Sequence, residues 1–118
     1  ADRRAGTALV FDEIDAGIGG AAAGAVGVRL GALARATQVV CVTHLAQIAS
    51  WADRHYALRK KTRGGATVVE LVLLDAKRDV LEEIARMLSG SVASAALEHA
   101  EALHREVGEE KARRVVRA

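Results

Sequence analysis

Two adjacent carboxylates, Asp12 and Glu13, follow directly on a run of four apolar residues at positions 8–11. An apolar run of this length is typical of a strand buried on both faces of a parallel sheet. Open α/β sheets bind their ligands at the carboxyl ends of such strands. Carboxylates placed there need a cation or a hydrogen-bond network to offset their lost solvation. The pair therefore predicts a polar or cation site, although a strand that runs into a solvated acidic turn would have the same pattern.

A single imidazole, His44, follows a second apolar run at residues 39–42. Residues 20–36, between the two runs, predict a helix because Val26, Leu30 and Leu33 recur on one face. A strand, a helix and a second strand form a βαβ unit with parallel strands. One sheet edge would then carry two carboxylates and an imidazole. For a lone histidine, a capping or packing role is the alternative.

The predicted helix also carries a row of glycines on one side, at positions 20, 24, 27 and 31. Each glycine inside a helix costs about 1 kcal/mol relative to alanine. We expect either that another backbone approaches this side closely, or that the row reflects a weakly specified, alanine-rich sequence.

The second half of the chain changes pattern. Residues 54–61 alternate in part, Gly64 and Gly65 predict a turn, and residues 66–74 predict a second strand. Together they indicate an antiparallel hairpin.

Two helices are predicted after the hairpin. Residues 80–88 are amphipathic and end before Gly90, a natural C-terminal capping residue. The last helix has an apolar line through residues 97, 100, 103 and 107, and residues 109–118 form a charged tail.

Composition limits the function classes only weakly. The chain has 118 residues, enough for one domain or part of one, and it is 51% hydrophobic but 3% aromatic, which predicts an aliphatic core. Cys41 is the only cysteine, so a reducing compartment is the simpler assumption. Residues 16–36 are too rich in glycine for a membrane span. Basic residues cluster at 59–63 and 111–117, where a solvated face is the main interpretation and nucleic-acid contact the alternative.

Taken together, these motifs resemble the C-terminal lobe of the head domain of SMC-type ABC ATPases. The sequence FDEIDAGIGG, at residues 11–20, is similar to that family's Walker B strand and D-loop, and VTHLAQIA, at residues 42–49, to its switch-histidine segment. The resemblance extends over residues 7–104. It implies an α/β P-loop NTPase fold with a mostly parallel sheet, an added antiparallel hairpin and C-terminal helices. The head part would span residues 1–108, with residues 109–118 as its tail.

The resemblance also implies roles for individual residues. Asp12 would hold Mg²⁺, Glu13 would act as general base toward the attacking water, and His44 would reach the γ-phosphate of ATP. Residues expected near the nucleotide or the opposite head are Asp15, Gly17, Gly19, Gly20 and Gln47. The implied cofactors are ATP and Mg²⁺. One departure is Gly19, which stands where SMC and transporter heads usually have an aspartate.

The function implied is that of the C-terminal portion of an ATP-binding protein of DNA repair and recombination, acting on double-strand breaks in the cytoplasm at the nucleoid. Its partners would be the N-terminal part of the same head, a second head in a homodimer, and DNA, with no membrane. No segment fits the phosphate-binding pattern GxxxxGK[ST], so we expect no ATP hydrolysis from the chain alone.

Two other functions stay open. The chain could be a non-catalytic α/β module for dimerisation or interaction. It could also be a nucleotide-binding fragment of an ABC transporter, although Ile14 and Asp15 stand where Pro-Thr is usual in that class.

Overall fold

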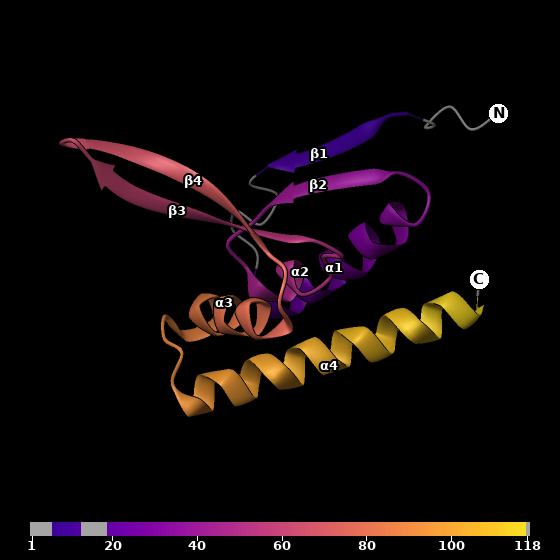
Figure 1. The fold of residues 1–118 in the computed structure, drawn as a ribbon. Coiled ribbons are helices and arrows are strands. Elements are labelled where there is room, and N and C mark those ends of the chain that lie inside the picture. The colour runs from indigo at the N-terminus through magenta and orange to yellow at the C-terminus, as the bar shows by residue number, and fades with distance from the viewer. Residues whose placement is uncertain (1–5, 13–18, 118) are drawn as a thin grey trace.

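The computed structural model describes residues 6–12 and 19–117, with side chains up to residue 114. In Figure 1 the helices gather on one side of the strands, and the β3–β4 hairpin extends away from them. The elements in chain order are β1 (Ala8–Asp12), α1 (Gly20–Ala34), β2 (Gln38–Val42), α2 (Ala46–Ala49), β3 (His55–Arg63), β4 (Ala66–Leu74), α3 (Lys77–Ser89) and α4 (Ser94–Arg117).

Strands β1 and β2 pair in parallel, with Ala8 opposite Gln38 and Asp12 opposite Val42. Helix α1 connects them, so the predicted βαβ unit is confirmed. The unit packs around buried Leu30 and other apolar side chains of α1 and α2, and the inward-facing residues of both strands lie against this cluster.

Only one face of the parallel pair is covered. Val10 is 69% exposed and Val40 is 44% exposed, and both point away from the helices because neighbouring strand residues face opposite sides. The prediction of a strand buried on both faces is therefore wrong for the described residues. The prediction fails because the four helices of the described chain all lie on the same side of the β1–β2 pair (Figure 1).

Strands β3 and β4 form the predicted antiparallel hairpin, with His55 opposite Leu74 and Arg63 opposite Ala66. The turn consists of Gly64 and Gly65, whose φ angles are 56° and 80°. Two successive left-handed residues are what a tight two-residue hairpin turn needs, and glycine adopts them without steric cost. Within the described part of the chain, the hairpin is a sheet separate from the parallel pair.

A second core joins α2, α3 and α4 around Ile84 and Ala100, each 0% exposed. Helix α3 ends as predicted, because Gly90 takes a left-handed φ of 75° and its N–H donates to the carbonyl of Arg86 at 2.7 Å. The apolar line of α4 also packs as predicted, with Val107 buried. Helix α4 continues through Gly108 to Arg117 without a break.

A close approach to the glycine row is found at Gly27 and Gly31, but its main partner is a side chain and not the backbone that was expected. A Cβ on Gly27 would lie 2.4 Å from Cδ1 of Trp51, and one on Gly31 would lie 2.6 Å from its Cε3. The approaching group is thus mainly an indole, joined by the backbone oxygen of Gln47 at 3.0 Å from the Gly27 Cβ position. Nothing lies within 4 Å of the position at Gly24.

The segment after His44 forms only a short helix. Helix α2 covers only Ala46–Ala49, and the next turn is closed by N–H groups of Trp51 and Ala52 that bond to carbonyls three residues earlier. The chain must turn here because β3 begins at His55.

In the described residues, no helix is long and apolar enough to cross a membrane.

Candidate functional site

The parallel register brings the two predicted chemical motifs to one edge. Asp12 is the last residue of β1 and lies opposite Val42, the last residue of β2. His44 follows two residues later, so the acid and the imidazole both leave the sheet at its carboxyl edge. Both residues are exposed, which leaves them accessible to a ligand.

A local turn positions His44. The Oγ1 of Thr43 accepts a hydrogen bond from the N–H of Leu45 at 3.0 Å, a side-chain turn that bends the chain at His44. Immediately afterwards, Ala46 and Ile48 of α2 are buried at 2% and 4% exposure. The histidine is therefore held between a paired strand and an anchored helix.

Three further predicted residues meet at the start of α1. Gly19 is the N-cap of this helix in an extended conformation, and its carbonyl accepts from the N–H of Ala23 at 2.9 Å. A Cβ on Gly20 would lie 3.5 Å from Nε2 of Gln47. The Gln47 side chain thus lies beside the first turn of α1.

The remaining predicted residues, Glu13, Asp15 and Gly17, lie outside the described residues. Their assigned roles stay predictions. They stand in the sequence between Asp12 and Gly19, both of which the structure does place.

The donor chemistry at this edge fits Mg²⁺. This ion prefers oxygen ligands and usually takes one or two carboxylates together with substrate phosphates and water. Asp12 offers one exposed carboxylate at the end of β1. In the described ranges, 6–12 and 19–117, no group of three or more His, Cys, Asp or Glu side chains could hold a metal on its own. A cation here would need phosphate oxygens or water to complete its shell.

A polar feature that sequence reasoning missed lies elsewhere. The Nδ1 atom of His55 is buried and has no hydrogen-bond partner among the described residues. Burial lowers the pKa of His55, although the carboxylate of Glu83 opposes this shift. Burial also lowers the pKa of His104, helped by Lys77 and Lys111. Alternation in β3 was the only sequence signal for His55, and alternation does not report burial.

Both histidines line a surface cavity of about 320 Å³ between the end of β4 and helices α3 and α4. Asp53 and Asp75 stand among its other lining residues. Neither Asp12 nor His44 contributes to it, so this cavity is distinct from the edge site.

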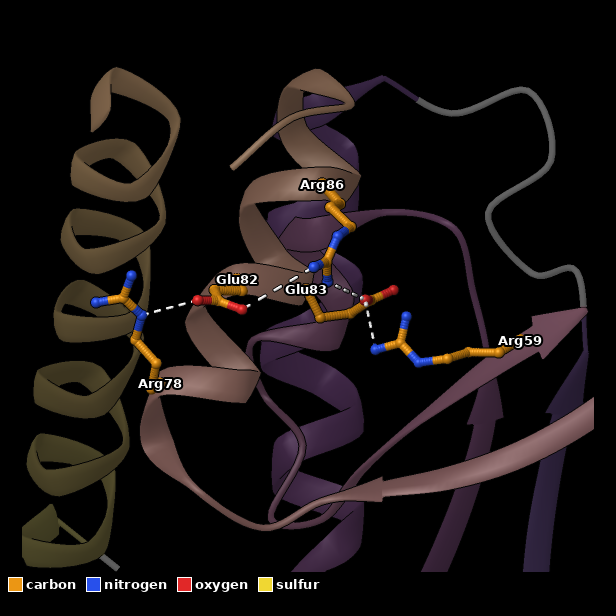
Figure 2. Close-up of polar contacts among 5 residues, drawn as sticks. All are labelled: Arg59, Arg78, Glu82, Glu83 and Arg86. Atoms are coloured by element: carbon orange, nitrogen blue, oxygen red, sulfur yellow. Dashed lines mark hydrogen bonds and ion pairs between the residues drawn. The ribbon is translucent and has the colours of Figure 1, made fainter. Parts of the chain in front are cut away.

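A chain of opposite charges connects the hairpin to α3 (Figure 2). Glu83 pairs with Arg59 of β3 at 3.7 Å and with Arg86 at 3.2 Å. Glu82 pairs with Arg86 at 3.9 Å and with Arg78 at 2.8 Å. Arg59 belongs to a basic stretch whose sequence pattern favoured a solvated face, and it is in fact held by an acid of the helix.

Comparisons with known proteins give relatives for most of the chain. No protein-family model matches it. A solved chain from structural work on ATP-driven dimerization and DNA-stimulated activation of SMC ATPases matches with 25% identity and a TM-score of 0.47, over 65% of this chain and 47% of that one. A TM-score this low carries no argument about the fold.

The sequence matches are much stronger. DNA repair protein RecN of Deinococcus radiodurans is 57% identical over 95 residues, which are 80% of this chain and 17% of the relative. RecN of Mycobacterium tuberculosis is 50% identical over 86 residues, covering 73% of this chain and 14% of the relative. RecN of Treponema pallidum is 48% identical over 98 residues, covering 82% of this chain and 17% of the relative.

By fold and site, the chain is an α/β segment whose parallel strands carry an acid and an imidazole to one edge. By sequence, it belongs to the RecN family and spans 17% of the length of the Deinococcus relative. The family resemblance seen in the motifs is therefore confirmed.

Proposed function

We propose that this chain is the C-terminal part of an SMC-like ATPase head in a RecN-type DNA repair protein. The observation that carries the proposal is the parallel register, which sets Asp12 opposite Val42 and so delivers Asp12 and His44 to the same edge. The 57% identity to a protein named DNA repair protein RecN supports the biological setting.

In this proposal the residues of the edge divide the work of ATP hydrolysis. Asp12 holds Mg²⁺ through its carboxylate, directly or through water. Glu13 accepts the proton of the attacking water, and His44 donates a hydrogen bond to the γ-phosphate. Mg²⁺ held there would supply positive charge that offsets the negative charge of the phosphates.

The start of α1 forms the second part of the proposed site. Nothing lies within 4 Å of the Cβ position at Gly19, and the amide of Gln47 lies beside Gly20. With Asp15 and Gly17, the two glycines would form a loop that touches a second head across the nucleotide, and Gln47 would support it. The proposal therefore includes a homodimer of two such heads.

The bare strand face supports a further partner, the N-terminal part of the same head. Parallel sheets in proteins are covered on both faces. Here Val10, Val40 and Val42 are 69%, 44% and 46% exposed. No segment of the 118 residues fits the phosphate-binding pattern GxxxxGK[ST]. The N-terminal part of the head, which would cover this face, would supply that loop. Such a protein would act in the cytoplasm at the nucleoid. A non-catalytic interaction module would share the bare face, but it gives no reason for the acid and imidazole to meet.

A chimera tests the catalytic roles. The matched residues of Deinococcus RecN would be replaced by those of this chain, and ATP turnover and ATP binding would be measured. We expect the Glu13→Gln chimera to bind ATP as the unmodified chimera does while turnover falls by about 10²–10⁴-fold, the usual effect of losing a general base. The matched control is Arg29→Ala, on the exposed face of α1. Turnover of the Glu13→Gln chimera equal to that of the control would remove Glu13 from its role.

A further inference from the structure

The β3–β4 hairpin changes character along its length. Near its base, one face exposes apolar side chains, among them Leu58 at 63% and Leu71 at 62%. Nearer the turn, residues 60–67 read KKTRGGAT and contain no acid. The exposed residues Val69 and Val68 lie opposite Lys60 and Lys61, so only residues 62–67 are without a large apolar side chain on either strand. The base therefore has an apolar surface suited to contact with a protein. The tip, residues 60–67, carries basic and hydroxyl side chains instead.

The hairpin concentrates the positive charge of the chain. Residues 55–74 hold four Lys or Arg side chains and one Glu, a net charge of +3, whereas the whole chain has +2. The remainder is thus slightly negative. The turn end of the hairpin projects from the body (Figure 1), whereas Arg59, nearer the base, still pairs with Glu83 of α3.

Part of this charge is neutralised, and part is not. Lys61 pairs with Glu70 at 2.8 Å, and Arg59 pairs with Glu83. Lys60 and Arg63 are exposed and have no acidic partner in the part of the chain that the structure describes. Since strand residues alternate in direction, Lys60 lies on one face of the ribbon and Arg63 on the other. The tip therefore presents available positive charge on both faces.

The other basic cluster differs in this respect. Lys111 of α4 lies 3.5 Å from Asp53. Arg113 and Arg114 both pair with Glu110. Among the described side chains, all three of these cations thus have an acidic partner, although Arg113 and Arg114 share one. The hairpin tip is the stronger candidate for an external anion.

We propose that the hairpin tip binds the phosphate backbone of double-stranded DNA as a β-ribbon. A major groove about 12 Å wide admits two strands, which lie about 4.8 Å apart. Gly64 and Gly65 make the end of the ribbon narrow because they carry no side chain. Thr62 and Thr67, which lie opposite each other in the strand register, add hydroxyl donors of the kind that contact phosphate.

An acidic protein is the competing partner, and the tip fits it less well. Protein interfaces are enriched in aromatic residues, Met and Arg and depleted in Lys. The tip has two lysines and no aromatic residue. The inference rests on the proposed function only in taking DNA as the nucleic acid, and it needs no ATP chemistry.

Fluorescence anisotropy with a labelled 30-base-pair DNA duplex tests the inference, without nucleotide or Mg²⁺, across a series of salt concentrations. The tip variant is Lys60→Ala with Arg63→Ala. The matched control is Arg29→Ala with Arg105→Ala, which removes the same charge from exposed helix positions. We expect at least tenfold weaker binding for the tip variant at low salt and less than a twofold change for the control. The slope of log affinity against log salt should fall by about 1.8 for the tip variant, since each phosphate contact contributes about 0.9.

Several outcomes would overturn the inference: no binding of DNA by the unmodified chain, equal weakening by both variants, or binding of poly-glutamate as tight as that of DNA. Thermal melts report whether the variants fold. If the alanine pair lowers the melting temperature, the Lys60→Gln with Arg63→Gln pair, which retains side-chain bulk, takes its place in the anisotropy measurement. Because the assay contains no ATP, its failure would leave the ATPase proposal intact, and loss of turnover in the chimera would leave this inference intact.

Discussion

The indole of Trp51 occupies space beside α1 that exists only because residue 27 is a glycine. A Cβ at Gly27 would lie 2.4 Å from Cδ1 and 2.7 Å from Nε1 of that ring. Contacts this short cannot be absorbed without moving the ring or the helix. The contact fixes where α2 ends relative to α1, and hence where the chain leaves the His44 turn.

Gly27→Ala is therefore expected to destabilise the chain despite the better helix propensity of alanine. Overpacking costs about 1–3 kcal/mol, which exceeds the gain of about 1 kcal/mol from replacing a helical glycine. Gly24→Ala is the matched control, because nothing lies within 4 Å of its Cβ position, and it should stabilise the chain. Urea unfolding of both variants measures the difference. Equal changes in the free energy of unfolding would contradict the packing seen at Trp51.

The partly buried imidazole of His55 predicts that stability falls on acidification. Its pKa is lowered in the folded state, so between the folded and unfolded pKa values the unfolded chain binds more protons. The free energy of unfolding should therefore be greatest above pH 6.5, the ordinary value, and decline as pH falls below it. Thermal melts between pH 8 and pH 5 would show the decline.

The His55→Leu variant should flatten this decline in part. The pKa of His104 is lowered in the same direction and keeps some dependence on pH. At pH 7.5 the leucine variant should be as stable as the parent or more so, because it removes a buried nitrogen without a partner. His99→Gln, at an exposed position of α4, is the control. A pH profile of His55→Leu that superimposes on that of the control would exclude His55 as a cause.

Glu83 should couple β3 to α3 by a small, salt-dependent energy. Its carboxylate pairs with Arg59 across the two elements, and the guanidinium is partly exposed. Pairs of this kind are worth about 0.2–1 kcal/mol and are screened by salt. A double-mutant cycle with Glu83→Gln and Arg59→Ala should give that coupling at low salt and almost none in 1 M NaCl. A coupling energy unchanged by salt would point to a contact other than the ion pair.

Substitutions of Asp12 and His44 should reduce ATP turnover without lowering the stability of the fold. Both are exposed at the carboxyl edge, where substitutions usually change the free energy of unfolding by less than about 0.5 kcal/mol. Asp12→Asn and His44→Ala should therefore melt like the parent chain. In the RecN chimera, however, each should reduce ATP turnover at least tenfold. Normal turnover in both variants would end the assignment of this edge to ATP.

The features that local sequence determines were predictable. Apolar runs gave β1 and β2, the glycine pair gave the hairpin turn, and Gly90 gave the end of α3. The convergence of Asp12 and His44 followed from the handedness of βαβ connections.

Features that depend on distant contacts were not predictable. The partner of Gly27 is Trp51, which is remote in sequence and reaches it only after α2 stops early. The exposed face of β1 and β2 could not be foreseen, because a continuous apolar run does not reveal whether a second layer is present. His55 shows the same limit, since alternation placed it on a strand but did not reveal its burial.

The uncovered face of the parallel pair has a practical consequence. Its exposed valines lie on a sheet whose outer strand edges find no partner among the described residues, and exposed apolar strands of this kind template association between molecules. At high protein concentration, the isolated chain should self-associate through this face. Co-expression with the remaining portion of a RecN protein should suppress this association, in the manner of a split reporter whose halves shield each other when they meet.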